Sequence, residues 1–329
     1  MDYINIAYVV SAVCFIFGIK MLSHPKTARK GNGVATLGML VAIAATLYAG
    51  EVLDFKMIGI GMLVGAVIGG FAAQKVEMTQ MPQLVAIFNG FGGGASALVA
   101  SAEFYVQYSN NPSTFMLVTI ILSVLIGTLT LTGSFIAFGK LQGFISGQPI
   151  VYPGQQMINA LFVLVLAALG YLLVGIPTEL NYFYGILIIS AILGITLTIP
   201  IGGADMPVVI SLLNSYSGIA AAATGFVLMN NALIISGALV GASGLILTQI
   251  MCKGMNRSLA NVIFGAVGGD AGGSGGKAQE LNIKSYSTEE AAMIFDAAEK
   301  VIIVPGYGLA VAQAQHATRE VAEWLEAQG

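Results

Sequence analysis

The stretch Phe115–Phe138, FMLVTIILSVLIGTLTLTGSFIAF, decides the fold, because it runs for 24 residues without a charged side chain. The hydrocarbon core of a bilayer is about 30 Å thick, and a helix needs about 20 apolar residues to cross it. The stretch is therefore predicted to be a transmembrane helix.

The composition of the whole chain points the same way. Of its 329 residues, 57% are apolar and 9% are charged, whereas a soluble domain carries about 25% charged residues. The mean hydropathy is +0.86. There is no basic stripe of the kind that binds nucleic acid, and two histidines and two separated cysteines offer no metal-ligand spacing. We therefore expect membrane lipid around the chain, no nucleic-acid partner and no metal site.

Eight further apolar stretches are long enough, or nearly so, to cross a bilayer. They are Ile4–Leu22, Gly33–Tyr48, Met57–Ala73, Pro82–Tyr105, Met157–Val174, Phe183–Pro200, Pro207–Met229 and Ala232–Cys252. Residues 1–262 are therefore predicted to form an all-α polytopic bundle of about nine transmembrane helices.

The cations between these spans predict the orientation. One set of alternating loops holds Lys26, Arg29, Lys30, Lys75 and Lys140, and Lys253 and Arg257 follow the last span. The opposite set holds only Lys56. Cytoplasmic loops carry the excess of Lys and Arg, so the N-terminus is predicted to lie outside and the tail to lie in the cytoplasm.

Glycines at four-residue spacing predict where helices approach one another closely. They are Gly61 with Gly65 and Gly69, Gly90 with Gly94, and Gly237 with Gly241.

The tail after the ninth span has a different character. Residues 263–286 are rich in glycine and are predicted to be a linker. Ser287 and Glu290 have the spacing of a capping box, which predicts an amphipathic helix that ends near Lys300. A buried strand is predicted over Val301–Val304, followed by the glycine turn Gly306-Tyr307-Gly308 and an alanine-rich helix.

A dinucleotide-binding fingerprint requires a strand that is followed by a glycine turn and then by a helix. A plain strand-to-helix turn explains the pattern equally well. One strand and two or three helices do not complete a doubly wound sheet. Residues 287–329 are therefore expected to be the N-terminal part of a truncated Rossmann-like α/β domain.

Four uncharged polar side chains lie inside the predicted spans, at similar distances from the cytoplasmic end. They are Asn89, Ser134, Asn214 and Ser243. Polar groups in a membrane interior are costly and often functional, so we expect a wet cavity that opens to the cytoplasm. Hydrogen bonds between helices, at about 0.6 to 2 kcal/mol each, are the alternative.

Three residues at the same end of the predicted bundle are candidates for coupling to the tail. Asp205 precedes Pro207 and suits a helix start, where the helix dipole favours a carboxylate. It is equally a candidate proton acceptor or a latch to the tail. Arg257 and Ser258 mark the exit of the ninth span, where an interfacial anchor is the usual role of an arginine.

Several segments together resemble a known family, the beta subunit of the proton-translocating NAD(P) transhydrogenase. The most specific are Gly202–Val209, GGADMPVV, which runs into Leu213–Gly218, and Pro305–Gln315, PGYGLAVAQAQ. The others are Lys75–Ile87, Thr132–Lys140, Gly237–Gly241 and Met251–Ser258. The likeness covers the chain from end to end.

This resemblance implies an enzyme of the bacterial inner (plasma) membrane. It would pass a hydride between NAD(H) on an alpha subunit and NADP(H) on this subunit, driven by protons towards NADPH. Alpha–beta units would pair as a homodimer. By this resemblance, Asp205 and Asn214 would belong to the proton pathway and its gate, and Arg257 and Ser258 would lie at the junction with the nucleotide domain. Together with the intramembrane polar residues Asn89, Ser134 and Ser243, they form the predicted proton pathway and gate. NADP(H) would contact Gly306, Tyr307 and Gly308, with Ala310 and Val311 beside them.

One position departs from that family. Many relatives carry a histidine where this chain has Asn89, and an asparagine does not titrate near neutral pH. The titrating group would then come from a helix of the alpha subunit. Two other interpretations of the chain stay open, a transporter or channel with a nucleotide-sensing tail, and a membrane anchor without catalysis.

Overall fold

The computed structural model describes residues 2–48, 54–264, 287–306, 309 and 314–328. The chain divides into two compact units, one of Met1–Val76 and Met81–Gly269, and one of Glu77–Gln80 and Asp270–Gly329. The secondary structure assigned within the described ranges is helical.

The first unit contains the predicted membrane bundle. Nine of its described helices are long and apolar enough to cross a bilayer, which confirms the predicted spans. They are α1 (Asp2–Leu22), α2 (Pro25–Tyr48), α3 (Phe55–Lys75), α4 (Met81–Gln107), α5 (Thr114–Leu141), α6 (Gln155–Gly175), α7 (Leu180–Thr198), α8 (Met206–Val227) and α9 (Asn231–Gly254). Three short helices accompany them in the chain, η1 (Met78–Gln80), η2 (Gly203–Asp205) and α10 (Leu259–Phe264).

Helix α2 begins eight residues earlier than its predicted span. Pro25 is its first residue, where a proline loses no hydrogen bond and its fixed φ already suits a helix. Lys26, Arg29 and Lys30 therefore lie on the first turns of α2 rather than in a loop. They remain at the end of the bundle that we call the basic end, where α1 ends and α2 begins.

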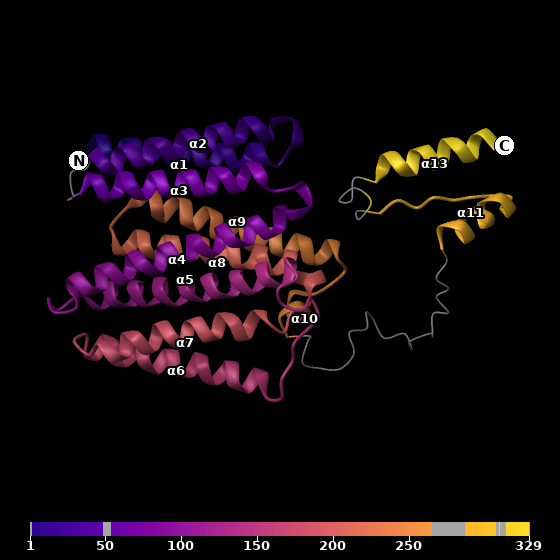
Figure 1. Ribbon diagram of the computed structural model, residues 1–329. Helices are drawn as coiled ribbons and strands as arrows, with labels where there is room; N and C mark the ends of the chain where they lie inside the picture. The colour runs from indigo at the N-terminus through magenta and orange to yellow at the C-terminus, as the bar shows by residue number, and fades with distance from the viewer. Residues whose placement is uncertain (1, 49–53, 265–286, 307–308, 310–313, 329) are drawn as a thin grey trace. The chain divides into compact units, whose positions relative to one another are not determined.

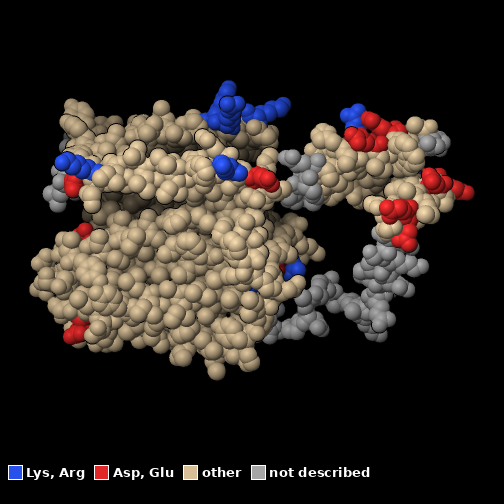
Figure 2. All heavy atoms as spheres, viewed as in Figure 1, with Lys and Arg blue, Asp and Glu red and all other residues tan. Residues whose placement is uncertain are grey.

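Helices α4, α5, α8 and α9 form the middle of the bundle (Figure 1). The α1–α2 pair packs on α9, and the α6–α7 pair packs on α5. Phe104 of α4 stacks on Phe183 of α7, with ring centroids 4.2 Å apart, and both side chains are fully buried. The flank of the bundle in Figure 2 is almost free of charged side chains, as a surface in contact with lipid requires.

Close approach of α8 and α9 depends on glycine. A Cβ atom added to Gly218 would collide with the backbone nitrogen of Gly241, and one added to Gly237 would collide with that of Ala222. Gly90 and Gly94 lie directly against α5. Two of the three predicted glycine contacts are therefore confirmed.

The third predicted contact, along Gly61, Gly65 and Gly69 of α3, is not made within the described chain. No atom lies within 4 Å of a Cβ built at any of them, and α3 has no buried residue. Small residues permit a close approach but do not by themselves attract a neighbour.

In the second unit, the predicted capping box is confirmed. The Ser287 N–H donates to Glu290 Oε2 over 2.7 Å, and the Glu290 N–H donates to Ser287 Oγ over 3.2 Å. These two hydrogen bonds cap the N-terminus of α11 (Thr288–Ala297), which ends three residues before the predicted end at Lys300. Helix α13 (Gln315–Gln328) follows later in the chain.

The predicted strand is wrong for the residues that the structure describes. Val301–Val304 form no strand, and Ile302 and Val304 are exposed. A strand needs a neighbour to satisfy its backbone groups, and the described part of this unit offers none. Ile263 and Phe264, the first two residues of the predicted linker, are the last residues of α10, and 265–286 lie outside the described residues.

Candidate functional site

A buried polar cluster joins three helices in the half of the bundle towards the basic end. The Nδ2 atom of Asn89 donates to Ser134 Oγ over 3.0 Å. Ser217 Oγ donates to Asn89 Oδ1 over 2.7 Å. Counted from Met81, Asn89 is the ninth residue of α4, which places it about 12 Å along the helix axis. The cluster therefore links α4, α5 and α8 inside the membrane-spanning part.

The other two predicted members of this layer lie apart from the cluster. Asn214 is also the ninth residue of its helix, counted from Met206, but its half-buried side chain has no hydrogen bond to a described residue. Ser243 Oγ donates to the Val240 carbonyl of its own helix over 3.2 Å. The structure thus brings together Asn89 and Ser134 of the four predicted residues.

Ser217 is a member of the cluster that the sequence did not single out. It follows Asn214 by three residues, and residues at that spacing lie on the same face of a helix. The helical spacing from Asn214 could therefore have identified Ser217. The criterion that was applied to the sequence, a similar depth in the membrane, could not.

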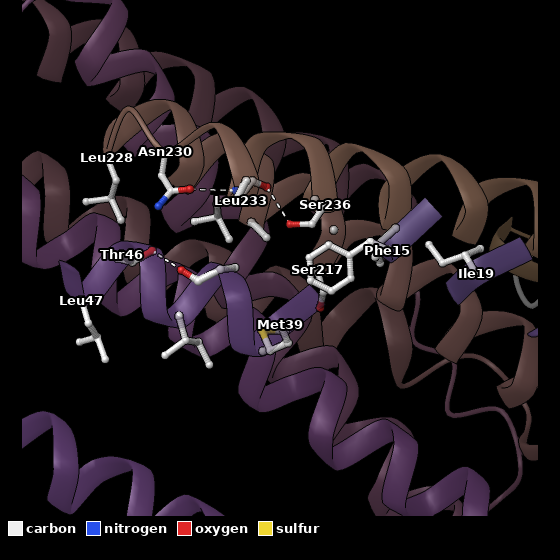
Figure 3. Close-up of a pocket in the computed structure, with 18 residues that line it drawn as sticks. Phe15, Ile19, Met39, Thr46, Leu47, Ser217, Leu228, Asn230, Leu233 and Ser236 are labelled. Carbon is white, nitrogen blue, oxygen red and sulfur yellow. Dashed lines mark hydrogen bonds between the residues drawn. The ribbon is translucent and has the colours of Figure 1, made fainter. Parts of the chain in front are cut away.

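An apolar pocket of about 580 Å³ adjoins the cluster (Figure 3). Residues of α1, α2, α8 and α9 form most of its wall, among them Phe15, Met39 and Ser217. Ser217 therefore contributes to the wall of the pocket while its hydroxyl bonds to Asn89. A side chain that entered the pocket could reach the hydrogen-bonded cluster through Ser217.

Asp205 forms an ion pair with Arg257 at the basic end. Its Oδ2 atom lies 3.3 Å from Arg257 Nη1, and the side chains are 14% and 48% exposed, respectively. Asp205 occupies the N-cap position of α8, as the sequence predicted, yet its side chain makes no capping hydrogen bond. Its Oδ1 atom is buried and has no hydrogen-bond partner among the described residues.

The backbone after α9 sets the position of Arg257. Asn256 has a φ of 53°, in the left-handed region that asparagine tolerates. The Asn256 N–H donates to the Lys253 carbonyl and the Arg257 N–H to the Cys252 carbonyl, which is the pattern of a Schellman motif. The hydroxyl of Ser258 then accepts from the Asn261 N–H over 3.1 Å and caps α10. The predicted pair Arg257 and Ser258 therefore forms a short, ordered turn.

Lys140 holds the segment that carries Asp205. Its side chain is 4% exposed, and its Nζ donates to the carbonyls of Gln148 and Ile201, over 3.0 and 2.8 Å. The connection after α5 is thereby tied to the connection before α8, and a bond of 2.7 Å from the Gly203 N–H to the Gly147 carbonyl reinforces it. The sequence indicated Lys140 only as a cytoplasmic loop cation.

The predicted nucleotide residues lie mostly beyond what the structure describes. Tyr307, Gly308, Ala310 and Val311 are outside the described residues. Gly306 is described, and a Cβ added to it would meet no atom within 4 Å.

Comparison with known proteins identifies the family. The family model for the NAD(P) transhydrogenase beta subunit matches residues 4–329. The NAD(P) transhydrogenase subunit beta of Rhodospirillum rubrum is 47% identical over an alignment of 336 positions, which covers 98% of this chain and 71% of that protein. A second protein of that name from the same species gives the same values. The chain therefore belongs to the NAD(P) transhydrogenase beta subunit family.

Proposed function

We propose that this chain couples proton movement across a membrane to hydride transfer between NAD(H) and NADP(H), in the direction of NADPH. Its membrane part, residues 1–262, would carry the protons. The observation that carries the proposal is the Asp205–Arg257 ion pair. It joins the start of α8, which holds Ser217 and Asn214, to the turn from which the chain continues towards the tail.

Energetics explain why such coupling is useful. The two nicotinamide couples are chemically almost identical, so hydride transfer alone has little driving force. One proton that crosses roughly 200 mV supplies about 4.6 kcal/mol. At 1.4 kcal/mol for each factor of ten, this shifts the NADPH ratio by about a thousandfold. The protein must therefore prevent hydride transfer that is not linked to proton passage.

Different membrane residues would take different parts in linking proton passage to hydride transfer. Asn89 does not titrate, and its hydrogen bonds to Ser134 and Ser217 suit it to orient a group beside it rather than to carry a proton. The titrating group would come from an alpha-subunit helix seated in the pocket beside Ser217 (Figure 3). Asn214 and Ser243 would line the path, and Asp205 with Arg257 and Ser258 would gate its cytoplasmic end.

The tail would bind NADP(H), and the alpha subunit would bind NAD(H). Residues 287–329 would begin a Rossmann-like domain in which Gly306, Tyr307, Gly308, Ala310 and Val311 contact NADP(H). The bound nucleotide would accept or donate the hydride, while this chain's residues hold it at the glycine turn. Pairs of alpha–beta units would lie in the bacterial inner membrane, with the N-terminus outside and the tail cytoplasmic.

An assay in sealed vesicles tests the proposal. The chain is reconstituted with its alpha subunit, and NADH-driven reduction of an NADP analogue is followed with and without an uncoupler. We expect reduction that needs both subunits and responds to the uncoupler. Ion or solute transport without hydride transfer would instead indicate a transporter, and no activity of either kind would indicate an anchor.

A further inference from the structure

The end of α1 and the start of α2 carry a concentrated group of cations. Four of the chain's 13 lysines and arginines lie within residues 20–30, and all four side chains are exposed. They are Lys20, Lys26, Arg29 and Lys30. The sequence has no acidic residue between Asp2 and Glu51, and no ion pair joins any of the four to an acid in the part of the chain that the structure describes. Figure 2 shows cationic side chains on the α1–α2 pair without acidic side chains among them.

Three of these cations lie on the face of α2 that points away from α1. Gly31 marks the face that packs on α1, because a Cβ atom added to it would meet the Gly18 carbonyl oxygen at 2.8 Å. Lys26, Arg29 and Lys30 are three or four residues apart and therefore share one face. This face lies roughly half a turn around the helix from Gly31, so the three cations point outward from the helix pair.

This arrangement is unfavourable without an anion. Like charges at three- and four-residue spacing on a helix repel each other. The three cations also occupy the first two turns of α2, where the helix dipole is positive, and the first turn holds no acid. A general excess of lysine and arginine at one membrane face would place cations at this end, but it does not require three of them on one side of a helix start. A bound anion would relieve both kinds of repulsion.

The same face of α2 becomes apolar further along the helix. Gly33, Leu37 and Leu40 continue the three- and four-residue spacing from Lys30. Leu37 and Leu40 are 57% and 61% exposed, and a Cβ atom added to Gly33 would meet no atom within 4 Å. One helix face therefore offers cations at its end and an open apolar surface beside them. An amphiphile with an anionic head and an apolar chain matches this order, whereas a free anion would use only the cations.

We propose that this face of α2 binds one anionic phospholipid. Its phosphate oxygens would accept charge-assisted hydrogen bonds from Lys26, Arg29 and Lys30, and an acyl chain would lie along Gly33 and Leu37. Basic residues next to a membrane span attract anionic lipid in this way. The surrounding bilayer supplies the occupant, and the site does not depend on hydride transfer or on the alpha subunit.

Native mass spectrometry of the full chain, purified in detergent and delipidated, tests the headgroup. Equal amounts of phosphatidylglycerol and phosphatidylcholine with the same acyl chains are added. We expect the first retained phospholipid to be phosphatidylglycerol, with at least about a tenfold preference, or 1.4 kcal/mol. The preference should weaken as salt screens the exposed cations. Excess inorganic phosphate should not displace the lipid, because it lacks an acyl chain. Displacement by phosphate would indicate a site for free anions and would overturn the proposal.

Variants test the position of the site. In the triple variant Lys26→Gln, Arg29→Gln and Lys30→Gln, the preference for phosphatidylglycerol should disappear. Glutamine is a good helix former and the three side chains are exposed, so the fold should persist. A control variant removes the same charge from three other exposed positions and should keep the preference. It carries Lys56→Gln, Lys75→Gln and Lys253→Gln.

The two variants together decide whether the lipid recognises this face or only the net charge of the chain. An equal loss of preference in both variants would mean that net charge sets the preference, and this would overturn the proposal. So would an unmodified chain that shows no preference, or a preference that survives the triple substitution in α2.

Discussion

Asp205 at the start of α8 and Arg257 after the end of α9 are joined by an ion pair of 3.3 Å. Two separate local structures position the partners. A Schellman motif directs the backbone of Arg257, and the segment before Asp205 is held through the bond from Lys140 to the Ile201 carbonyl. The ion pair thus connects two independently built turns at the basic end of the bundle.

Replacement of Arg257 should affect function more than stability. An ion pair with a half-exposed arginine contributes about 1 kcal/mol or less, so Arg257→Gln should change the free energy of unfolding little. Coupled NADPH formation in vesicles should nevertheless fall at least about tenfold. Arg257→Lys, which keeps the charge, should recover part of it. A loss of activity fully explained by destabilisation would contradict the gating role.

Removal of the Ser217 hydroxyl should destabilise the polar cluster. Ser217→Ala leaves Asn89 Oδ1 without its donor, and an unpaired buried acceptor costs about 1–3 kcal/mol. Ser243→Ala is the matched control, because that hydroxyl bonds only to its own helix and should be nearly neutral. Unfolding of both variants in detergent micelles measures the difference, and equal stabilities would argue against the cluster.

Lys140→Met should release the segment that carries Asp205. The substitution leaves the carbonyls of Gln148 and Ile201 without their charged donor. We expect destabilisation of about 2 kcal/mol or more and faster amide hydrogen exchange over residues 199–205. Lys253→Met removes an exposed cation from the same end and serves as the control. Unchanged exchange over 199–205 would show that Lys140 does not hold this segment.

Alanine substitutions at two glycines should distinguish helix contacts within the chain from helix contacts with a partner subunit. Gly218→Ala would push a methyl group into the backbone of α9 and should destabilise the chain by about 1–3 kcal/mol. Gly65→Ala meets no atom within 4 Å and should leave the isolated chain unaffected. If Gly65→Ala weakens assembly with the alpha subunit in a pull-down, α3 contacts that subunit. A destabilised isolated chain would mean that α3 packs within it.

The bundle was predictable because each helix carries an apolar run long enough for the bilayer, and this depends on local sequence alone. The start of α2 was missed because Lys26, Arg29 and Lys30 suggested a loop, although Pro25 is a favourable first helical residue. The strand at Val301–Val304 was wrong because apolar β-branched residues predict a strand only where a neighbouring strand is available.

The candidate site was predictable only where a residue stands out in its local sequence. Asn89 and Ser134 stood out as polar residues in apolar helices, and the structure joins them. Ser217 and Lys140 did not stand out, because their roles depend on contacts with residues distant in the sequence. Lys140 meets Ile201 from another connection, 61 positions away, and no local pattern encodes that contact.

The proton-to-hydride link through Asp205 is tested most directly in sealed vesicles that contain both subunits. NADH-driven reduction of an NADP analogue is measured with and without an uncoupler for the unmodified chain, for Asp205→Asn and for Asp54→Asn. Asp54 caps α3 at the opposite end, and asparagine caps a helix equally well. We predict that coupled reduction falls at least about tenfold in Asp205→Asn alone. Coupled activity and an uncoupler response equal to those of the unmodified chain would contradict the account.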